Sequence, residues 1–110
     1  MNEIIHKNLT ENRWHTFSLA EQLGNIGSEV SRASRQEGKD QKLFDGAVER
    51  ALELFSLTLS DKRWKNRMRE LGRVKEVFCD AILGGEEYGS KLKDIQKYFD
   101  YFGILAMSKI

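Results

Sequence analysis

Five polar residues near the start of the chain recur at the spacing of a single helix face. These residues are His15, Ser18, Gln22, Asn25 and Glu29, and successive members are separated by three, four, three and four positions. At about 100° per residue, a helix would place them in one narrow strip beside an apolar stripe. Solvated helix faces mostly carry Lys and Glu, whereas neutral hydrogen-bonding groups suit a partly buried seam. This polar seam predicts a binding groove or an oligomer interface; a solvated flank or an internal hydrogen-bond network that fixes helix register would give the same pattern.

Arg67 is a sixth polar residue that we group with the polar seam. A helical wheel places it on the buried side of its helix, between Val74 and Phe78. A buried guanidinium must be paired, because removing its partner costs several kcal/mol. The candidate partners are the carboxylates Glu21, Glu29, Glu49 and Glu53. The pattern predicts either a structural Arg–Glu pair or one polar site that joins Arg67, Glu29 and His15.

A cationic stripe in the second half of the chain is the other candidate binding surface. The stripe comprises Lys62, Lys65, Arg69 and Arg73, which are separated by three, four and four positions. A stripe of this kind can neutralise nucleic-acid phosphates. The preceding segment is acidic, however, with the carboxylates Asp40, Asp45, Glu49 and Glu53. Complementary charge between neighbouring helices is therefore the alternative explanation of the stripe.

The sequence offers few groups for catalysis or metal binding. Its two histidines, His6 and His15, are nine residues apart, which is not the spacing of metal ligands on one helix. Cys79 is the sole cysteine, and we expect an inert, partly buried thiol. No Glu-x-x-His pair, phosphate-binding glycine loop or catalytic serine motif is present in the sequence. We therefore expect no catalytic residue, no metal and no cofactor.

The composition limits the class of protein to which these residues belong. The chain has 110 residues, 40% of them hydrophobic and 32% charged, with a formal net charge of +1. We expect one domain over residues 1–110, with a flexible or loosely packed N-terminus over residues 1–9. The balanced charge exerts no overall pull toward nucleic acid or anionic membrane. No signal-peptide core or apolar run of roughly 20 residues is present, so we expect a soluble, cytoplasmic protein without a membrane partner.

Four segments with helical periodicity must position these residues. Their expected ranges are 12–36, 40–59, 60–84 and 90–107. The absence of proline permits long helices, and short connections favour antiparallel neighbours. We therefore predict an all-α fold, arranged as an up-and-down four-helix bundle. Gly24 and Gly27 further predict the close approach of another backbone, because each helix glycine costs about 1 kcal/mol relative to alanine.

Three segments of the sequence are similar to a known family. They are residues 11–30 (ENRWHTFSLAEQLGNIGSEV), residues 63–71 (RW…RMREL) and residues 87–100 (EYGS…IQKYFD). Over nearly its whole length, the chain resembles a family of small uncharacterised prokaryotic helical proteins. The resemblance implies a four-helix bundle and brings no activity with it.

More loosely, the expected architecture is similar to the HEPN group of helical bundles. Many of these act as ribonuclease toxins or as partners of nucleotidyltransferase-like proteins. Their catalytic motif is an arginine followed four to six residues later by a histidine. In this chain, Arg13 precedes His15 by only two residues, and the motif is absent. The resemblance therefore transfers no catalytic residue.

Together, these patterns favour a non-enzymatic protein-interaction module that forms a homo-oligomer, with a dimer as the expected state. The polar seam and Arg67 would form its specific surface or its internal register device. The alternative is an RNA-binding protein or a HEPN-like ribonuclease of a toxin system. In that case the cationic stripe would contact phosphates, and His15 would be the acid–base group because imidazole titrates near pH 6.5. A small-molecule site between helices is a third hypothesis.

Overall fold

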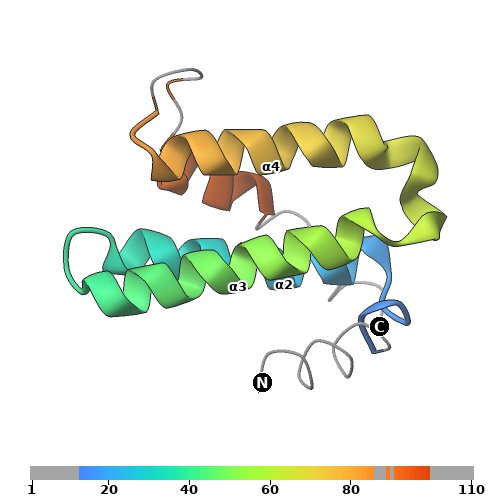
Figure 1. The fold of residues 1–110 in the computed structure, drawn as a ribbon, viewed down its shortest axis with the longest axis horizontal. Helices are drawn as coiled ribbons and strands as arrows, with labels where there is room; N and C mark the ends of the chain where they lie inside the picture. Colours follow the sequence, from blue (N-terminus) through green and yellow to red (C-terminus); the bar gives the residue numbers. More distant parts are fainter. Residues whose placement is uncertain (1–12, 86–88, 90, 100–110) are drawn as a thin grey trace.

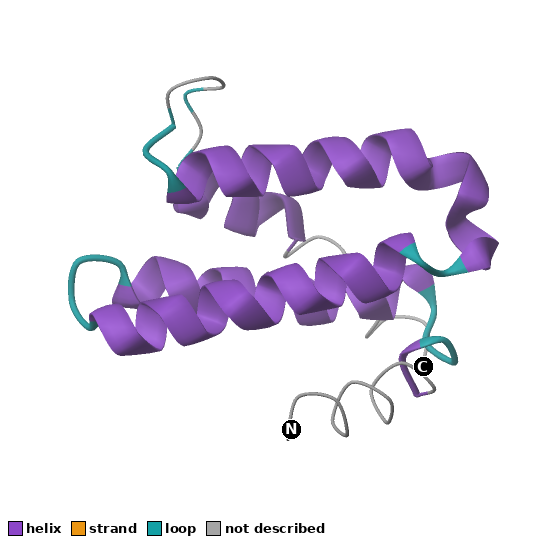
Figure 2. Cartoon of the chain, in the orientation of Figure 1, coloured by secondary structure: helices purple, strands orange, loops and turns teal. Residues whose placement is uncertain are grey.

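The computed structural model describes residues 13–85, 89 and 91–99, and these residues form helices and turns without a strand (Figure 2). This confirms the predicted all-α class. The helices are α2, Leu19–Gln36; α3, Gln41–Leu59; the 3₁₀ helix η1, Lys62–Arg67; and α4, Met68–Ile82. Residues 92–99 form a further helical segment. Within the described residues, no helix combines the length and the apolar character needed to cross a lipid bilayer.

Helix α2 begins later than the sequence pattern predicts. Ser18 is its N-cap: the Ser18 hydroxyl accepts the Glu21 N–H at 3.1 Å, and the Glu21 carboxylate accepts the Ser18 N–H at 2.8 Å. This capping box fixes the helix start, because it satisfies two N–H groups that lack a partner within the helix. Residues 15–17 form a turn before it. The predicted continuous helix over residues 12–36 is therefore wrong upstream of Ser18.

Helix α3 runs antiparallel to α2 after a short turn (Figure 1). Asp40 caps α3 by accepting the Leu43 N–H at 3.0 Å. The turn contains Gly38 at φ +77°, a left-handed conformation that glycine adopts without a Cβ clash. The predicted helix over residues 40–59 is confirmed.

The third predicted helix is divided in two. Asp61 caps the start of this segment by accepting the Arg63 N–H at 3.1 Å, but residues 62–67 form the 3₁₀ helix η1. Trp64 departs from helical geometry, with φ −99° and ψ 21°, and Arg67, with φ −112° and ψ 6°, separates η1 from α4. One helical wheel over the whole segment is therefore wrong, because 3₁₀ and α-helices rotate by different angles per residue.

Three phenylalanines join the helices in the core. The ring centroid of Phe55 on α3 lies 5.6 Å from that of Phe78 on α4 and 5.8 Å from that of Phe99. All three side chains are almost completely buried. A Cβ atom at Gly27 of α2 would overlap with the Cβ of Phe99. The predicted close approach at a glycine of the first segment is thus confirmed at Gly27.

The 92–99 segment lies between α2 and α4 in Figure 1, where it is coloured orange-red. Its contacts with Gly27 and Phe55 fix it against the α2–α3 hairpin. Two further predictions fall outside the described residues: the loosely packed stretch 1–9, and the ends of the last predicted helix at residue 90 and over residues 100–107.

Candidate functional site

A buried polar network surrounds Gln22 of α2. The side-chain amide of Gln22 donates to the Trp14 carbonyl oxygen at 2.9 Å and to Oδ2 of Asp61 at 3.1 Å. Its carbonyl oxygen accepts the indole N–H of Trp64 at 2.9 Å. Gln22 is 0% exposed, and the three bonds use both amide donors and the acceptor. This single side chain ties α2 to the segment before it and to η1.

Asp61 connects the Gln22 network to a cation at the surface. The Arg63 side chain donates to its carboxylate from Nε, at 3.0 Å to Oδ1 and 3.3 Å to Oδ2, and from Nη2 to Oδ2 at 2.7 Å. The carboxylate is buried, whereas the Arg63 side chain is partly exposed. The hydrogen bond from Arg63 lowers the pKa of Asp61 from 3.8 to about 2, opposed by burial and assisted by the bond from Gln22. The bond to Asp61 also raises the pKa of Arg63, so both groups are charged at neutral pH.

Two further hydrogen bonds extend this network. Arg63 Nη2 donates to the Phe17 carbonyl oxygen at 2.6 Å, and the Trp14 indole N–H donates to the Thr58 hydroxyl at 3.0 Å. The Arg63 guanidinium also lies 4.4 Å from the centre of the Trp64 ring, a cation–π contact. The segment before α2 is thereby fastened to the end of α3 and to η1.

The structure places the members of the polar seam in different environments. Gln22 is the centre of the network, and Ser18 is the N-cap of α2. His15 lies beside the network on the turn before α2, half-buried, with Nε2 at 3.4 Å from both the Leu57 carbonyl oxygen and the Ser60 hydroxyl. Because α2 begins only after Ser18, His15 does not share a continuous helix with Gln22.

Glu29 and Arg67 do not meet. Glu29 is buried on α2 and pairs with Arg32, one turn along, at 3.1 Å. Arg67 is exposed and pairs with Glu70 at 2.7 Å. The predicted buried position of Arg67 is wrong, because the irregular backbone between η1 and α4 changes the direction of its side chain. Asn25 is exposed and donates to the carbonyl oxygen one turn before it, at 2.8 Å.

The polar atoms of Gln22 and Asp61 are all engaged within the chain, so neither side chain offers a free group to a ligand. Their contacts fit the hypothesis of an internal network that fixes the register of the helices. In the part of the chain that the structure describes, no group of three or more His, Cys, Asp and Glu residues could hold a metal ion.

The kink divides the predicted cationic stripe. Lys62 and Lys65 lie on η1, whereas Arg69 and Arg73 lie on α4, and all four are exposed. Among the described residues, Lys62, Lys65 and Arg69 form no ion pair. The acidic residues of α3 therefore do not neutralise these three cations through direct pairs.

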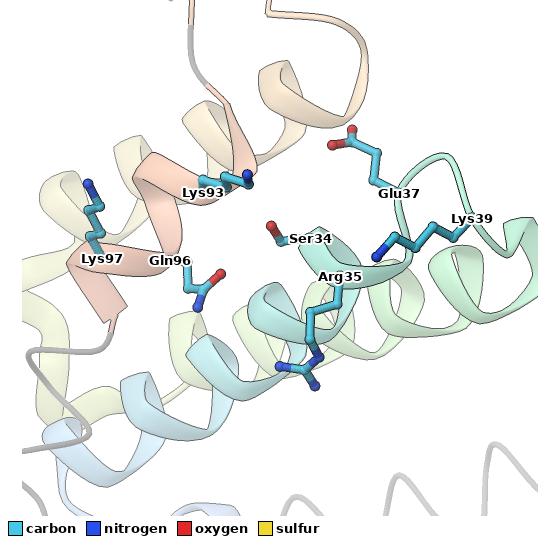
Figure 3. Close-up of a pocket in the computed structure, with 7 residues that line it drawn as sticks. All are labelled: Ser34, Arg35, Glu37, Lys39, Lys93, Gln96 and Lys97. Carbon is cyan, nitrogen blue, oxygen red and sulfur yellow. The ribbon is translucent and has the colours of Figure 1, made fainter.

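A second basic surface lies near the C-terminal end of α2. An open pocket of about 670 Å³ is formed by α2, the turn before α3 and the 92–99 segment (Figure 3). We name it the basic pocket; its lining residues are Ser34, Arg35, Glu37, Lys39, Lys93, Gln96 and Lys97. Four cations and one carboxylate line it, so it has an excess of positive charge.

Two cations of the basic pocket extend toward a small hydroxyl. In Figure 3, the side chains of Lys39 and Lys93 extend toward Ser34 from different sides. Arg35 donates to the hydroxyl of Ser31 at 2.7 Å. Lys39, Lys93 and Lys97 are exposed and make no ion pair with another residue that the structure describes. Neighbouring like charges repel each other, so an anion bound among them would be stabilised.

The position of Lys93 supports a role outside folding. It lies in the first turn of the helical segment over residues 92–99. The N-terminal end of a helix carries a partial positive charge, so a lysine there is slightly unfavourable for the helix. Helix stability therefore does not account for a cation at this position.

Periodicity does not reveal the basic pocket, because its residues come from segments that are far apart in the sequence. The available signal is the cluster of Lys91, Lys93 and Lys97 in a short stretch that contains only one acid, Asp94. For the Gln22 network, the signal is the helix-capping residue Asp61 beside Arg63. Their ion pair depends on the turn between α3 and η1.

No protein-family model, curated protein or solved structure matches this chain. The geometry of the site is therefore the basis for inferring its function.

Proposed function

We propose that this chain is a non-enzymatic helical module that binds single-stranded RNA through the phosphate backbone, with the basic pocket as the main contact. The observation that supports this most is that Lys39, Lys93 and Lys97, from two separate elements, line one pocket without ion-pair partners in the described part of the chain. Lysines that neutralise phosphates release condensed counterions, which is the main source of sequence-independent affinity for nucleic acids.

The lining of the basic pocket favours a nucleic acid over a protein as the partner. None of its lining residues is apolar. Protein interfaces depend on a buried apolar or aromatic anchor at their centre, which this lining does not offer. Ser34 and Gln96 instead supply neutral hydrogen-bonding groups among the cations, which suit the 2′-hydroxyl and the base edges of an RNA strand.

The exposed cations at the other end of the α2–α3 hairpin support a second contact with the same strand. Lys62, Lys65 and Arg69 lie around η1, which Figure 1 places at the end of the hairpin opposite the α2–α3 turn. Because they belong to a different surface, we assign them a weaker, accessory contact with phosphates.

The proposal contains no catalytic step. His15 precedes α2, whereas Ser34 lies near its C-terminal end. An α-helix of 18 residues is about 27 Å long, so the imidazole is remote from the basic pocket. An acid–base group must lie within hydrogen-bond reach of the reacting atom, which this separation prevents at the pocket.

We further propose that the helices are arranged as an up-and-down bundle and that the module acts in the cytoplasm. The antiparallel α2–α3 hairpin and the short connection from α3 to η1 support the bundle. A single cysteine, which needs no oxidising compartment, supports the location.

Filter binding of the full chain to a labelled single-stranded RNA, measured across a series of salt concentrations, tests the proposal. Three lysine–phosphate contacts predict that log K falls against log salt with a slope of about −2. Absence of binding at low salt, or binding that does not depend on salt, would contradict the proposal. Cleavage of the RNA by the purified chain would contradict the non-enzymatic part.

A further inference from the structure

The exposed face of α3 is centred on a glycine. At about 100° per residue, the positions that share this face span one turn on either side of Gly46. We name it the α3 face; its residues are the exposed Lys42, Leu43, Gly46, Glu49 and Arg50, with the buried Ala47 at its edge. None of them lines the basic pocket, so an inference about this face goes beyond the proposed RNA binding.

The packing of the described residues does not explain Gly46. Glycine in the middle of a helix lowers helix stability relative to alanine. At Gly27 the compensation is visible, since a Cβ there would overlap with Phe99. At Gly46 a Cβ would meet no atom within 4 Å, and the residue is exposed. Its usual benefit, the close approach of another backbone, is not supplied by any residue that the structure describes.

A shallow groove and an exposed side chain flank Gly46. Leu43 is 55% exposed, although most large apolar side chains of α3 are covered. Leu43 itself lines a groove of about 330 Å³, together with Lys42, Gly46, Ala47 and Arg50 of α3 and with Glu29 and Arg32 of α2. In a two-fold symmetric contact, each copy supplies one Leu43 side chain and one groove. The two features can therefore pair twice across the same interface.

The charges on the α3 face are ordered along the helix. Lys42 lies before Gly46 and Glu49 lies after it, on the same flank of the face. Neither makes an ion pair with any residue that the structure describes. A two-fold axis perpendicular to α3 at Gly46 reverses the helix direction but keeps each flank with itself. It therefore brings Lys42 opposite the partner's Glu49, and Leu43 opposite the apolar stem of the partner's Arg50.

From these observations we propose that two copies of this chain associate through the α3 face as an antiparallel, two-fold symmetric dimer. The two Gly46 positions meet at the crossing point, and each Leu43 enters the groove beside the partner's Ala47. Lys42 pairs with the partner's Glu49 on the rim. The contact involves one helix from each copy, so it belongs with small interfaces and a Kd in the micromolar range.

Sedimentation equilibrium of the full chain tests this dimer. We expect wild type to dimerise and Gly46→Gln to weaken dimerisation at least tenfold, because a side chain then separates the helices. Gly46→Gln should not lower the Tm of the monomer, since glutamine is the better helix former. Gly72→Gln is the matched control, because Gly72 is also a helix glycine at which an added Cβ would meet no atom within 4 Å. That variant should dimerise like wild type.

The charge pair supplies a second and independent test. Lys42→Glu and Glu49→Lys should each weaken the dimer, and the double variant should restore it, because the exchanged charges again face each other. The proposal is overturned if wild type stays monomeric up to about 200 μM, where a micromolar Kd would populate the dimer. It is also overturned if Gly46→Gln dimerises as well as Gly72→Gln does, or if the double charge variant shows no recovery.

Discussion

Gln22 and Asp61 lie 3.1 Å apart in the interior, and the hydrogen bond between them ties helix α2 to the start of η1. Gln22 is neutral, whereas Asp61 is held in its charged form by Arg63. The amide donates to Oδ2, the carboxylate oxygen that Arg63 Nη2 also contacts, so both residues stabilise the buried charge. Leaving a buried polar group without a partner lowers the free energy of unfolding, so the fold should be sensitive to substitution of either residue.

Replacing Gln22 with leucine should lower the free energy of unfolding by about 2–4 kcal/mol, because two buried polar groups and one half-buried polar group then lose a partner. These groups are the Trp14 carbonyl, the Asp61 carboxylate and the Trp64 indole N–H. Urea denaturation followed by circular dichroism measures the loss. Asn25→Ala is the control, since that exposed side chain bonds only within its own helix and should change stability by about 0.5 kcal/mol or less. Equal effects of the two substitutions would refute a structural role for the network.

The ion pair of Asp61 predicts a loss of stability in acid. Its pKa is about 2 in the folded chain, below the ordinary 3.8, so the unfolded chain takes up the proton first as the pH falls. The contribution is complete above about pH 5 and is lost as the pH falls through about 4 to 2. We expect it to be about 1–2 kcal/mol, reduced by the solvent exposure of Arg63.

Comparison of wild type with Asp61→Asn isolates this effect from the other carboxylates. The difference between their free energies of unfolding should be largest near neutral pH and should shrink toward pH 2. A difference that stays constant across that range would show that the Asp61 pKa is not lowered in the folded chain.

The two glycines at positions 27 and 72 should respond in opposite directions to alanine. Gly27→Ala should lower stability by more than about 1 kcal/mol, since the new methyl overlaps with Phe99 in a close-packed core. Gly72→Ala should raise stability by up to about 1 kcal/mol, since the site is open and alanine is the better helix former. Thermal denaturation of wild type and of both variants measures these changes as shifts in Tm. A stabilising Gly27→Ala would mean that α2 and the 92–99 segment do not pack as closely as described.

The helices that begin at a strong local signal are those that the sequence predicts well. Helix α3 begins after the cap Asp40, and its predicted range is confirmed. The start of α2 is also present in the sequence as the Ser18-x-x-Glu21 capping box, but the helical spacing of His15, Ser18 and Gln22 continues across it and hides the break. No comparable sequence pattern predicts η1, because residues 62–67 contain neither glycine nor proline. Its 3₁₀ geometry depends on the contacts of Asp61 and Trp64.

The candidate sites are less predictable than the helices, because each combines residues from distant segments. The polar seam contains Gln22, whose buried network is formed with residues from η1 and from the turn before α2. The interruption of the helix separates His15 from Gln22, whereas Asn25 and Glu29 share α2 with Gln22 but make contacts of their own. For the basic pocket, the charges are visible in the sequence, but their convergence depends on the packing of the 92–99 segment against α2.

Two matched neutralisations test the proposed RNA contact most directly. One variant combines Lys39→Gln, Lys93→Gln and Lys97→Gln in the basic pocket, and the other combines Lys62→Gln, Lys65→Gln and Arg69→Gln around η1. Both remove three positive charges, so any effect of net charge on RNA binding is the same. Filter binding across salt should show the pocket variant at least tenfold weaker than wild type, with a salt slope smaller by about 2, and the η1 variant less affected. Equal losses in the two variants, or full binding by the pocket variant, would contradict the assignment of the basic pocket as the RNA site.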